Sequence, residues 1–156
     1  LQKFCSEKEF IEEIKKYRLY NKKIVMTNGC FDIIHAGHIN YLKEAKKLGD
    51  KLVVAVNSDL SIKNLKGEGR PINLFKDRVN VLSAIDIVDL IVMFDSDTPE
   101  ELIKKVKPDI LVKGSDYNIN QIAGAKYILA NGGEVKLIEL TKDLSTSNIV
   151  NKLNDL

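Results

Sequence analysis

Five short runs of mostly Val, Ile and Leu recur along the chain, and stretches with the apolar spacing of helices separate them. The apolar runs lie at residues 23–27, 51–57, 89–94, 109–114 and 134–140. Runs that are apolar throughout, rather than at alternate positions, are typical of strands buried on both faces of a parallel sheet. We therefore predict an α/β fold: one doubly wound, Rossmann-like domain with about five parallel strands and flanking helices.

The connecting stretches carry helix signals, and the 156 residues fit one domain, 1–156. Helices are predicted at about 6–20, 39–49, 74–85, 98–106, 120–131 and 145–153. Ser6 and Glu9 have the spacing of a capping box at the start of the N-terminal helix. The stretch at about 60–73 contains Gly and Lys without clear periodicity, and we predict that it forms a mobile lid loop.

Charge and cysteine usage narrow the function classes. Lys and Arg total 24 against 22 Asp and Glu, so we expect no nucleic-acid partner. No apolar run approaches the roughly 18 residues of a membrane span, so we expect no membrane partner either. Cys5 and Cys30 are the two cysteines, which suits a reducing compartment and a cytoplasmic location. Because the chain begins at Leu1 rather than Met, we expect a piece of a longer protein that lacks an upstream domain.

The stretch NGCFDIIHAGH, from Asn28 to His38, follows the first predicted strand and contains both histidines of the chain. In doubly wound sheets, ligands bind beyond the carboxyl ends of the strands. Gly29 allows a tight turn at this point, and the amides around Cys30 and Phe31 can point at a ligand. The stretch is therefore a candidate binding loop.

Two histidines at the start of the following helix indicate a phosphate site. The helix is predicted to begin near Gly37 and His38, where free amides and the helix dipole favour an anion. His35 lies three positions before His38, and we predict that the two imidazoles face one another across a phosphate. A metal site with Asp32 is the rival interpretation, but no third histidine or cysteine pair completes a zinc-binding set. The loop also lacks GxGxxG and GxxxxGK[ST], which argues against dinucleotide dehydrogenases and P-loop kinases.

These residues carry a family resemblance. NGCFDIIHAGH resembles the HxGH signature of the nucleotidyltransferase superfamily. The resemblance extends from about Lys23 to Leu153 through LGDKLVVAVNSD, LKGEGRPIN, DTPEELIKKVKPDILVKGSDY, IAGAKYILANGGEVKLI and LSTSNIV. Together these segments are similar to the heptose 1-phosphate adenylyltransferase domain of the bifunctional heptose kinase/adenylyltransferase. In many bacteria that domain is fused behind a sugar kinase, which would account for a chain that starts at Leu1.

The resemblance implies a reaction. AMP would pass from ATP to D-glycero-D-manno-heptose 1-phosphate, giving ADP-heptose for the lipopolysaccharide core and pyrophosphate. The sugar phosphate is already ionised at neutral pH, so catalysis needs alignment and charge stabilisation rather than a general base. Mg²⁺ is expected with ATP, held mainly by phosphate oxygens and water, and a homodimer is common among the relatives.

The resemblance also implies site residues. The catalytic set is His35, His38 and Lys66. The nucleotide-binding set is Asn28, Gly29, Cys30, Phe31, His35, Gly37, His38, Arg70, Ser145, Thr146 and Ser147. The acceptor-binding set is Asp32, Asn57, Asp59, Lys113, Gly114 and Asp116, of which Asp116 can also serve the nucleotide ribose. No protein metal site is implied.

Several of these residues keep a simpler interpretation. Lys66 can be a solvated loop lysine, Asp59 can cap the next segment, and Ser145 can be a plain helix cap. Arg78 lies in a predicted helix, and we interpret it as an ion-pair partner outside the site.

Other activities also stay open. One alternative is a cytidylyltransferase that acts on glycerol 3-phosphate or another small phosphorylated alcohol, and a second is a non-catalytic nucleotide-binding module. Cytidylyltransferases carry an RTxGIST run where this chain has LTKDLST, which weakens the first alternative and leaves Lys142 as a substitute for the missing arginine.

Overall fold

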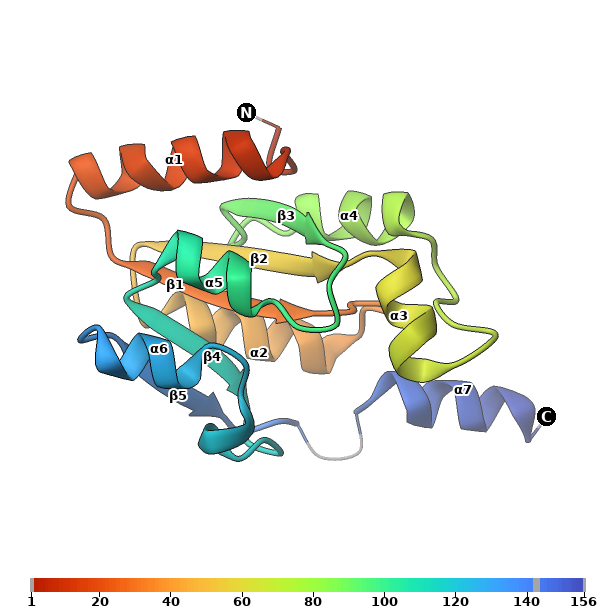
Figure 1. The fold of residues 1–156 in the computed structure, drawn as a ribbon. Coiled ribbons are helices and arrows are strands. Elements are labelled where there is room, and N and C mark those ends of the chain that lie inside the picture. The colour runs from red at the N-terminus through yellow and green to blue at the C-terminus, as the bar shows by residue number, and fades with distance from the viewer. Residues whose placement is uncertain (1, 142–143, 156) are drawn as a thin grey trace.

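The computed structural model describes residues 2–141 and 144–155. Within them, five strands form one sheet in the order β3-β2-β1-β4-β5 (Figure 1). The strands are β1 (Ile24–Gly29), β2 (Lys51–Asn57), β3 (Leu90–Phe94), β4 (Ile110–Gly114) and β5 (Glu134–Ile138). All neighbouring pairs run parallel. The chain therefore winds outward from β1 in both directions, which confirms the predicted doubly wound fold.

Helices cover both faces of the sheet and its carboxyl edge. They are α1 (Glu7–Leu19), α2 (Ala36–Lys46), α3 (Asp59–Lys66), α4 (Phe75–Ser83), α5 (Glu100–Val106), the 3₁₀ turn η1 (Ile119–Gln121), α6 (Ala125–Ala130) and α7 (Thr146–Asn154). In Figure 1, α1, α5 and α6 lie on one face of the sheet and α2 and α4 on the other. Helices α3 and α7 lie beyond the arrowheads of the central strands. No helix in the described part of the chain is long and apolar enough to cross a membrane.

The strands contribute side chains to two cores, one on each face. Along β1, Ile24 and Met26 pack with α1, α5 and α6, whereas Val25 packs with α2 and α4. All three are fully buried. Burying such a side chain contributes about 1.5–3 kcal/mol, which is why strands between two helical layers are apolar at every position.

Two predicted elements differ from the structure. The prediction of a lid loop at 60–73 is wrong for its first half, because residues 59–66 form α3. Residues 67–73 have no regular secondary structure. The Ser58 hydroxyl caps α3 by accepting from the Ser61 amide at 3.1 Å. This short helix buries two residues, Ser61 and Ile62, so it adds little to the apolar pattern that predicts helices.

The predicted helix at 120–131 is divided. Gly124 has φ +80°, and a Cβ there would lie 2.8 Å from Ile103 Cγ2, so the chain turns at this glycine between η1 and α6. The N-terminal helix is confirmed as α1, and its capping box forms: the Ser6 amide donates to the Glu9 carboxylate at 2.9 Å.

Candidate active site

Two adjoining cavities open at the carboxyl edge of the sheet. The first measures about 310 Å³ and the second about 460 Å³. Their shared wall consists of Asn28, Gly29, Cys30, Phe31, His38, Lys66, Lys113, Tyr117 and Thr146. Two ligands bound side by side in these cavities would therefore meet at the end of β1, between a histidine and two lysines.

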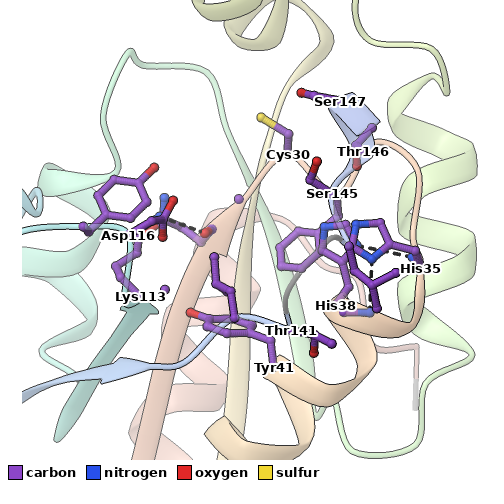
Figure 2. Close-up of a pocket in the computed structure, with 18 of the residues that line it drawn as sticks. Cys30, His35, His38, Tyr41, Lys113, Asp116, Thr141, Ser145, Thr146 and Ser147 are labelled. Atoms are coloured by element: carbon purple, nitrogen blue, oxygen red, sulfur yellow. Dashed lines mark hydrogen bonds between the residues drawn. The ribbon is translucent and has the colours of Figure 1, made fainter. Parts of the chain in front are cut away.

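The two histidines form one hydrogen-bonded unit at the start of α2. His35 is the N-cap residue, and its Nδ1 accepts from the Gly37 amide at 3.1 Å. His38 Nδ1 accepts from the His35 amide at 3.3 Å. The ring centroids lie 4.0 Å apart, so the rings touch and do not face one another across a phosphate as predicted. Both side chains line the first cavity, beside the start of α7 (Figure 2).

Burial keeps this pair neutral. It lowers the pKa of His35, and burial, His35 and Lys66 together lower the pKa of His38 to about 4. Since each Nδ1 accepts a hydrogen bond, the proton of each neutral ring is on Nε2. The site therefore offers two Nε2–H donors without a fixed positive charge on either ring.

Gly37 is required by this packing. A Cβ at position 37 would lie 2.8 Å from His35 Cε1 and 3.2 Å from Leu144 Cβ. The glycine of the HAGH sequence therefore makes room for the imidazole that folds over it.

Arg78 holds the loop between β1 and α2 in place through a hydrogen bond to its backbone. Phe31 has φ +48°, an unusual backbone conformation for a non-glycine residue. The fully buried Arg78 guanidinium donates from Nη1 to the Cys30 carbonyl at 2.6 Å. Across a trans peptide the N–H points opposite to the C=O. The Phe31 amide is thereby turned away from Arg78, and Phe31 lines both cavities.

Arg78 holds two further segments. Its Nε donates to the Asn73 carbonyl at 3.0 Å, and its Nη2 pairs with the Asp59 carboxylate at 2.8 Å. The interpretation of Arg78 as an ion-pair partner is confirmed. Asp59 lines neither cavity, and its carboxylate is used to anchor Arg78 rather than being free for an acceptor.

Asp32 and Arg70 also bind one another. The Asp32 carboxylate accepts from Arg70 Nε at 2.7 Å and from the amides of Ile72 and Asn73 at 2.9 and 2.8 Å. Burial by itself would raise the pKa of Asp32, but these hydrogen bonds and the arginine charge hold it below its usual value. Asp32 reaches the second cavity, whereas Arg70 lines neither cavity, although its buried Nη2 has no partner in the described residues.

Lysines come from two sides of the shared wall. Lys66 is the last residue of α3, and its side chain is exposed to both cavities. Lys113, at the end of β4, donates to the Asn28 carbonyl at 3.2 Å and lies 4.6 Å from the centre of the Tyr117 ring. Burial lowers the pKa of Lys113, and the nearby Asp116 opposes that effect.

The remaining predicted residues divide between the cavities. Gly114, Asp116, Ser145 and Ser147 line the first cavity only. A Cβ on Gly114 would lie 2.6 Å from Asp116 Oδ1, so this glycine leaves space for the carboxylate. Figure 2 shows Lys113 and Asp116 across the first cavity from the histidines. Asn57 lines the second cavity only.

The start of α7 closes the first cavity. The Ser145 hydroxyl accepts from the Asn148 amide at 3.0 Å, so the capping interpretation of Ser145 is confirmed. The Thr146 hydroxyl donates to the Ile33 carbonyl at 3.2 Å. Lys142 lies outside the described residues.

Sequence reasoning missed other lining residues. They are Tyr41, Leu65, Phe94, Asp97, Thr98, Pro99, Tyr117, Gln121, Ile122, Ala123, Leu140, Thr141 and Leu144. Asp97 and Tyr117 lie in stretches directly after predicted strands, so their positions could have indicated them. Among the described residues, no group of three or more His, Cys, Asp or Glu side chains could hold a metal ion.

Comparison with known proteins places this geometry in a family. The family model described as cytidylyltransferase-like matches residues 26–152, most of the chain and all of the shared wall. The chain belongs to the cytidylyltransferase-like family. The match begins within β1 and includes both histidines of the HxGH pair.

Named relatives of this cytidylyltransferase-like chain are longer proteins. It is 52% identical over 149 residues to the bifunctional protein HldE of Marinomonas sp. strain MWYL1, and the match covers 96% of this chain and 31% of that protein. It is 51% identical over 148 residues to the HldE protein of Haemophilus influenzae, covering 95% and 31% of the two chains. The chain spans about a third of the length of the curated relatives it matches.

Solved structures share the fold of this family member. A crystal structure of the lipopolysaccharide core biosynthesis protein from Thermoplasma volcanium is 36% identical, with a TM-score of 0.62, and the match covers 78% of this chain and 98% of that one. Pantoate-beta-alanine ligase from Francisella tularensis is 14% identical, with a TM-score of 0.65 over 100% of this chain and 79% of that one. The second likeness shows the fold alone.

Proposed function

We propose that the chain transfers AMP from ATP to D-glycero-D-manno-heptose 1-phosphate, releasing pyrophosphate and forming ADP-heptose. The observation that carries the proposal is the pair of cavities with a shared wall of His38, Lys66 and Lys113. An adenylyl transfer needs two anions held side by side, with donors at the phosphorus that moves between them. The HldE relatives and the lipopolysaccharide core biosynthesis protein support the heptose substrate.

The nucleotide is assigned to the first cavity. Its phosphates would lie against the Phe31 amide and the start of α2, and the ribose and base toward Asp116 and Tyr117. This changes the assignment that the resemblance implied for Gly114 and Asp116, because we place both with the nucleotide rather than with the acceptor. Apolar Leu140, 41% exposed, lies beside Gly114 in the same cavity and suits a flat base.

The acceptor is assigned to the second cavity. An oxygen of the sugar phosphate attacks the α-phosphorus of ATP, the new P–O bond forms, and the bond from the α-phosphorus to the bridging oxygen breaks. Pyrophosphate leaves with the electron pair, and no proton needs to move because the nucleophile is already anionic. The Nε2–H groups of His35 and His38, with Lys66 and Lys113, would stabilise the charge that develops on the transferring phosphoryl group.

Mg²⁺ enters this proposal as a companion of ATP. The Asp32 carboxylate near the shared wall is occupied by Arg70 and two amides, so the described residues do not suit a protein-held ion. We propose that the triphosphate oxygens and water hold the ion. The location we propose is the cytoplasm, where ATP is available and the free thiols of Cys5 and Cys30 stay reduced.

Pyrophosphate release tests the proposal. ATP, Mg²⁺ and each anomer of heptose 1-phosphate are compared with glycerol 3-phosphate, and then CTP replaces ATP. Release with ATP and one heptose phosphate, lost in His38→Ala, is expected. Release with CTP and glycerol 3-phosphate would keep the chemistry and overturn the substrates. Nucleotide binding without turnover of any acceptor would instead indicate the non-catalytic module.

A further inference from the structure

Outside the wall shared with the first cavity, the polar side chains of the second cavity fall into two groups. Asp32 and Asn57 are buried and already bonded within the protein: Asn57 Nδ2 donates to the Ser61 hydroxyl at 2.9 Å, and Asp32 binds the segment at 70–73. Asn57 Oδ1 also accepts from the Cys30 thiol at 3.8 Å, so both side chains use part of their hydrogen-bonding capacity within the protein. Both residues line the cavity, and the acceptor contacts predicted for them from the sequence stay predictions.

The second group is free. Asp97, Thr98 and Gln121 line the second cavity and are exposed. In the part of the chain that the structure describes, their side chains form no hydrogen bond or ion pair. Asp97 and Thr98 lie between β3 and α5, and Gln121 ends η1. Two connections that are distant in sequence thus bring a carboxylate, a hydroxyl and an amide to one cavity.

Charge is distributed unevenly along this cavity. The wall shared with the first cavity holds Lys66 and Lys113, whereas the carboxylates of Asp32 and Asp97 line only the second cavity, and that of Asp32 is paired with Arg70. A phosphate is attracted to the lysines and repelled by the carboxylate. An acceptor would therefore bind with its phosphate at the shared wall and its other end toward Asp97.

We propose that Asp97, Thr98 and Gln121 bind the hydroxyl groups of the acceptor and so select a polyhydroxylated sugar phosphate. The inference rests on the proposed function for the direction of binding, and it names residues for the acceptor's far end. A carboxylate can accept from two neighbouring hydroxyls, and an amide can both donate and accept. Glycerol 3-phosphate is shorter and has fewer hydroxyl groups, so we expect this group to contribute less to its binding.

Kinetics of single variants test the proposal. Asp97→Ala and Gln121→Ala are assayed for pyrophosphate release with heptose 1-phosphate at saturating ATP, and then with ATP varied. Loss of a hydrogen bond to a charged group predicts a fall of about 10- to 100-fold in kcat/KM for the sugar phosphate in Asp97→Ala. The KM for ATP should stay within about twofold, because Asp97 does not line the nucleotide cavity.

Asp95→Ala is the matched control. Asp95 is an exposed carboxylate two residues away that lines a different surface cavity. It should leave both constants unchanged. If Asp97→Ala and Gln121→Ala behave like Asp95→Ala, the proposal is wrong. Equal losses for heptose 1-phosphate and glycerol 3-phosphate would also overturn it, since a hydroxyl-binding group affects the longer acceptor selectively. Preferred turnover of phosphoethanolamine would show that Asp97 binds an ammonium group instead.

Failure of the proposed function can be separated from failure of this inference. If the wild-type chain releases no pyrophosphate with any sugar phosphate, the proposed function fails. Calorimetry with a non-hydrolysable ATP analogue and sugar 1-phosphates then tests the inference alone. Weaker binding to Asp97→Ala than to Asp95→Ala supports it; equal binding, or no binding to the wild-type chain, overturns it.

Discussion

At the scale of single residues, His35 and His38 each accept a hydrogen bond from a backbone amide at Nδ1. The loop therefore determines the tautomer of both rings. A neutral imidazole with a bound Nδ1 directs its Nε2–H outward as a donor. A preformed donor needs no reorganisation when charge develops on a phosphoryl group, and such donors contribute most where water is excluded. The pair is therefore positioned before any ligand binds.

The first prediction concerns Gly37→Ala. The added methyl group would lie 2.9 Å from His35 Nδ1, so the ring must move and its hydrogen bond from the Gly37 amide is lost. A displacement of about 1 Å in a catalytic group can cost on the order of 100-fold in rate. We expect kcat/KM for ATP to fall by about that factor in steady-state assays. The free energy of unfolding should change by no more than about 1 kcal/mol, because alanine favours a helix.

Ala36→Ser is the control for this prediction. Ala36 is the exposed first residue of α2, and a small change there touches neither ring. The serine variant should retain wild-type kinetics. Full activity of Gly37→Ala would show that His35 does not need the observed position.

At the scale of elements, the segment from α3 to α4 wraps around the loop between β1 and α2. Arg78 and Asp32 join the two through buried hydrogen bonds, while Lys66 ends α3 at the shared wall. The position of Lys66 and the conformation of the loop between β1 and α2 therefore depend on the same contacts.

The second prediction is that Arg78→Met loosens this joint. The change leaves the carbonyls of Cys30 and Asn73 without their hydrogen-bond donor. Because the Arg78 side chain is fully buried, water cannot take the place of the guanidinium unless the surrounding residues move. Asp59 is 40% exposed, so its share of the loss is small. We expect the free energy of unfolding in urea to fall by about 2–4 kcal/mol and the KM for ATP to rise.

Lys76→Met is the matched control, since Lys76 is exposed on the same helix. Its stability should stay within about 0.5 kcal/mol of the wild type. Comparable stability of the two variants would contradict a structural role for Arg78.

The third prediction concerns α7. None of the described residues of α7 is buried, yet its first turn lines the first cavity, to which we assign the nucleotide. Helices with few buried contacts open locally at low free energy. In hydrogen-exchange mass spectrometry we expect α7 amides to exchange faster than those of α1, which buries Phe10 and Ile14, and to slow when ATP binds. Equal protection of the two helices without ATP, or no change in α7 with ATP, would argue against this.

The sequence predicted most of what depends on local pattern. Continuous apolar runs indicated buried strands, and the strand ends indicated where His38 and Lys113 would lie. The arginine partners of Asp32 and Asp59 could not be predicted. The sequence pattern of a carboxylate after a strand is the same whether its side chain binds a substrate or pairs with an arginine. Arg70 and Arg78 decide that question, and their partners are 38 and 19 residues away in sequence.

At the scale of the whole molecule, the sheet separates stability from function. Its two cores lie between the helical layers, and the polar groups of the site gather at the carboxyl edge. The His38 side chain contributes both to the stability of the fold and to the site. His38 is partly buried against Phe31, at 5.5 Å between ring centroids, so its protonation affects folding as well as binding.

The last prediction is a pH dependence of stability that originates at His38. The unfolded imidazole has a pKa near 6.5, and in the folded chain burial lowers it to about 4. As pH falls below 6.5, the unfolded state takes up a proton that the folded state does not. The stabilisation is thus complete above pH 6.5 and is lost progressively toward pH 4, by on the order of 2 kcal/mol. The lowered pKa values of Asp32 and Asp89 act at lower pH, where their carboxylates protonate.

Urea unfolding at pH 7.5, 6.5, 5.5 and 4.5 measures how the free energy of unfolding changes with pH. His38→Gln, which cannot titrate, should flatten this dependence over the same range. Parallel slopes in the two proteins would place the titrating group elsewhere, and His35, whose pKa burial also lowers, would be the next to test.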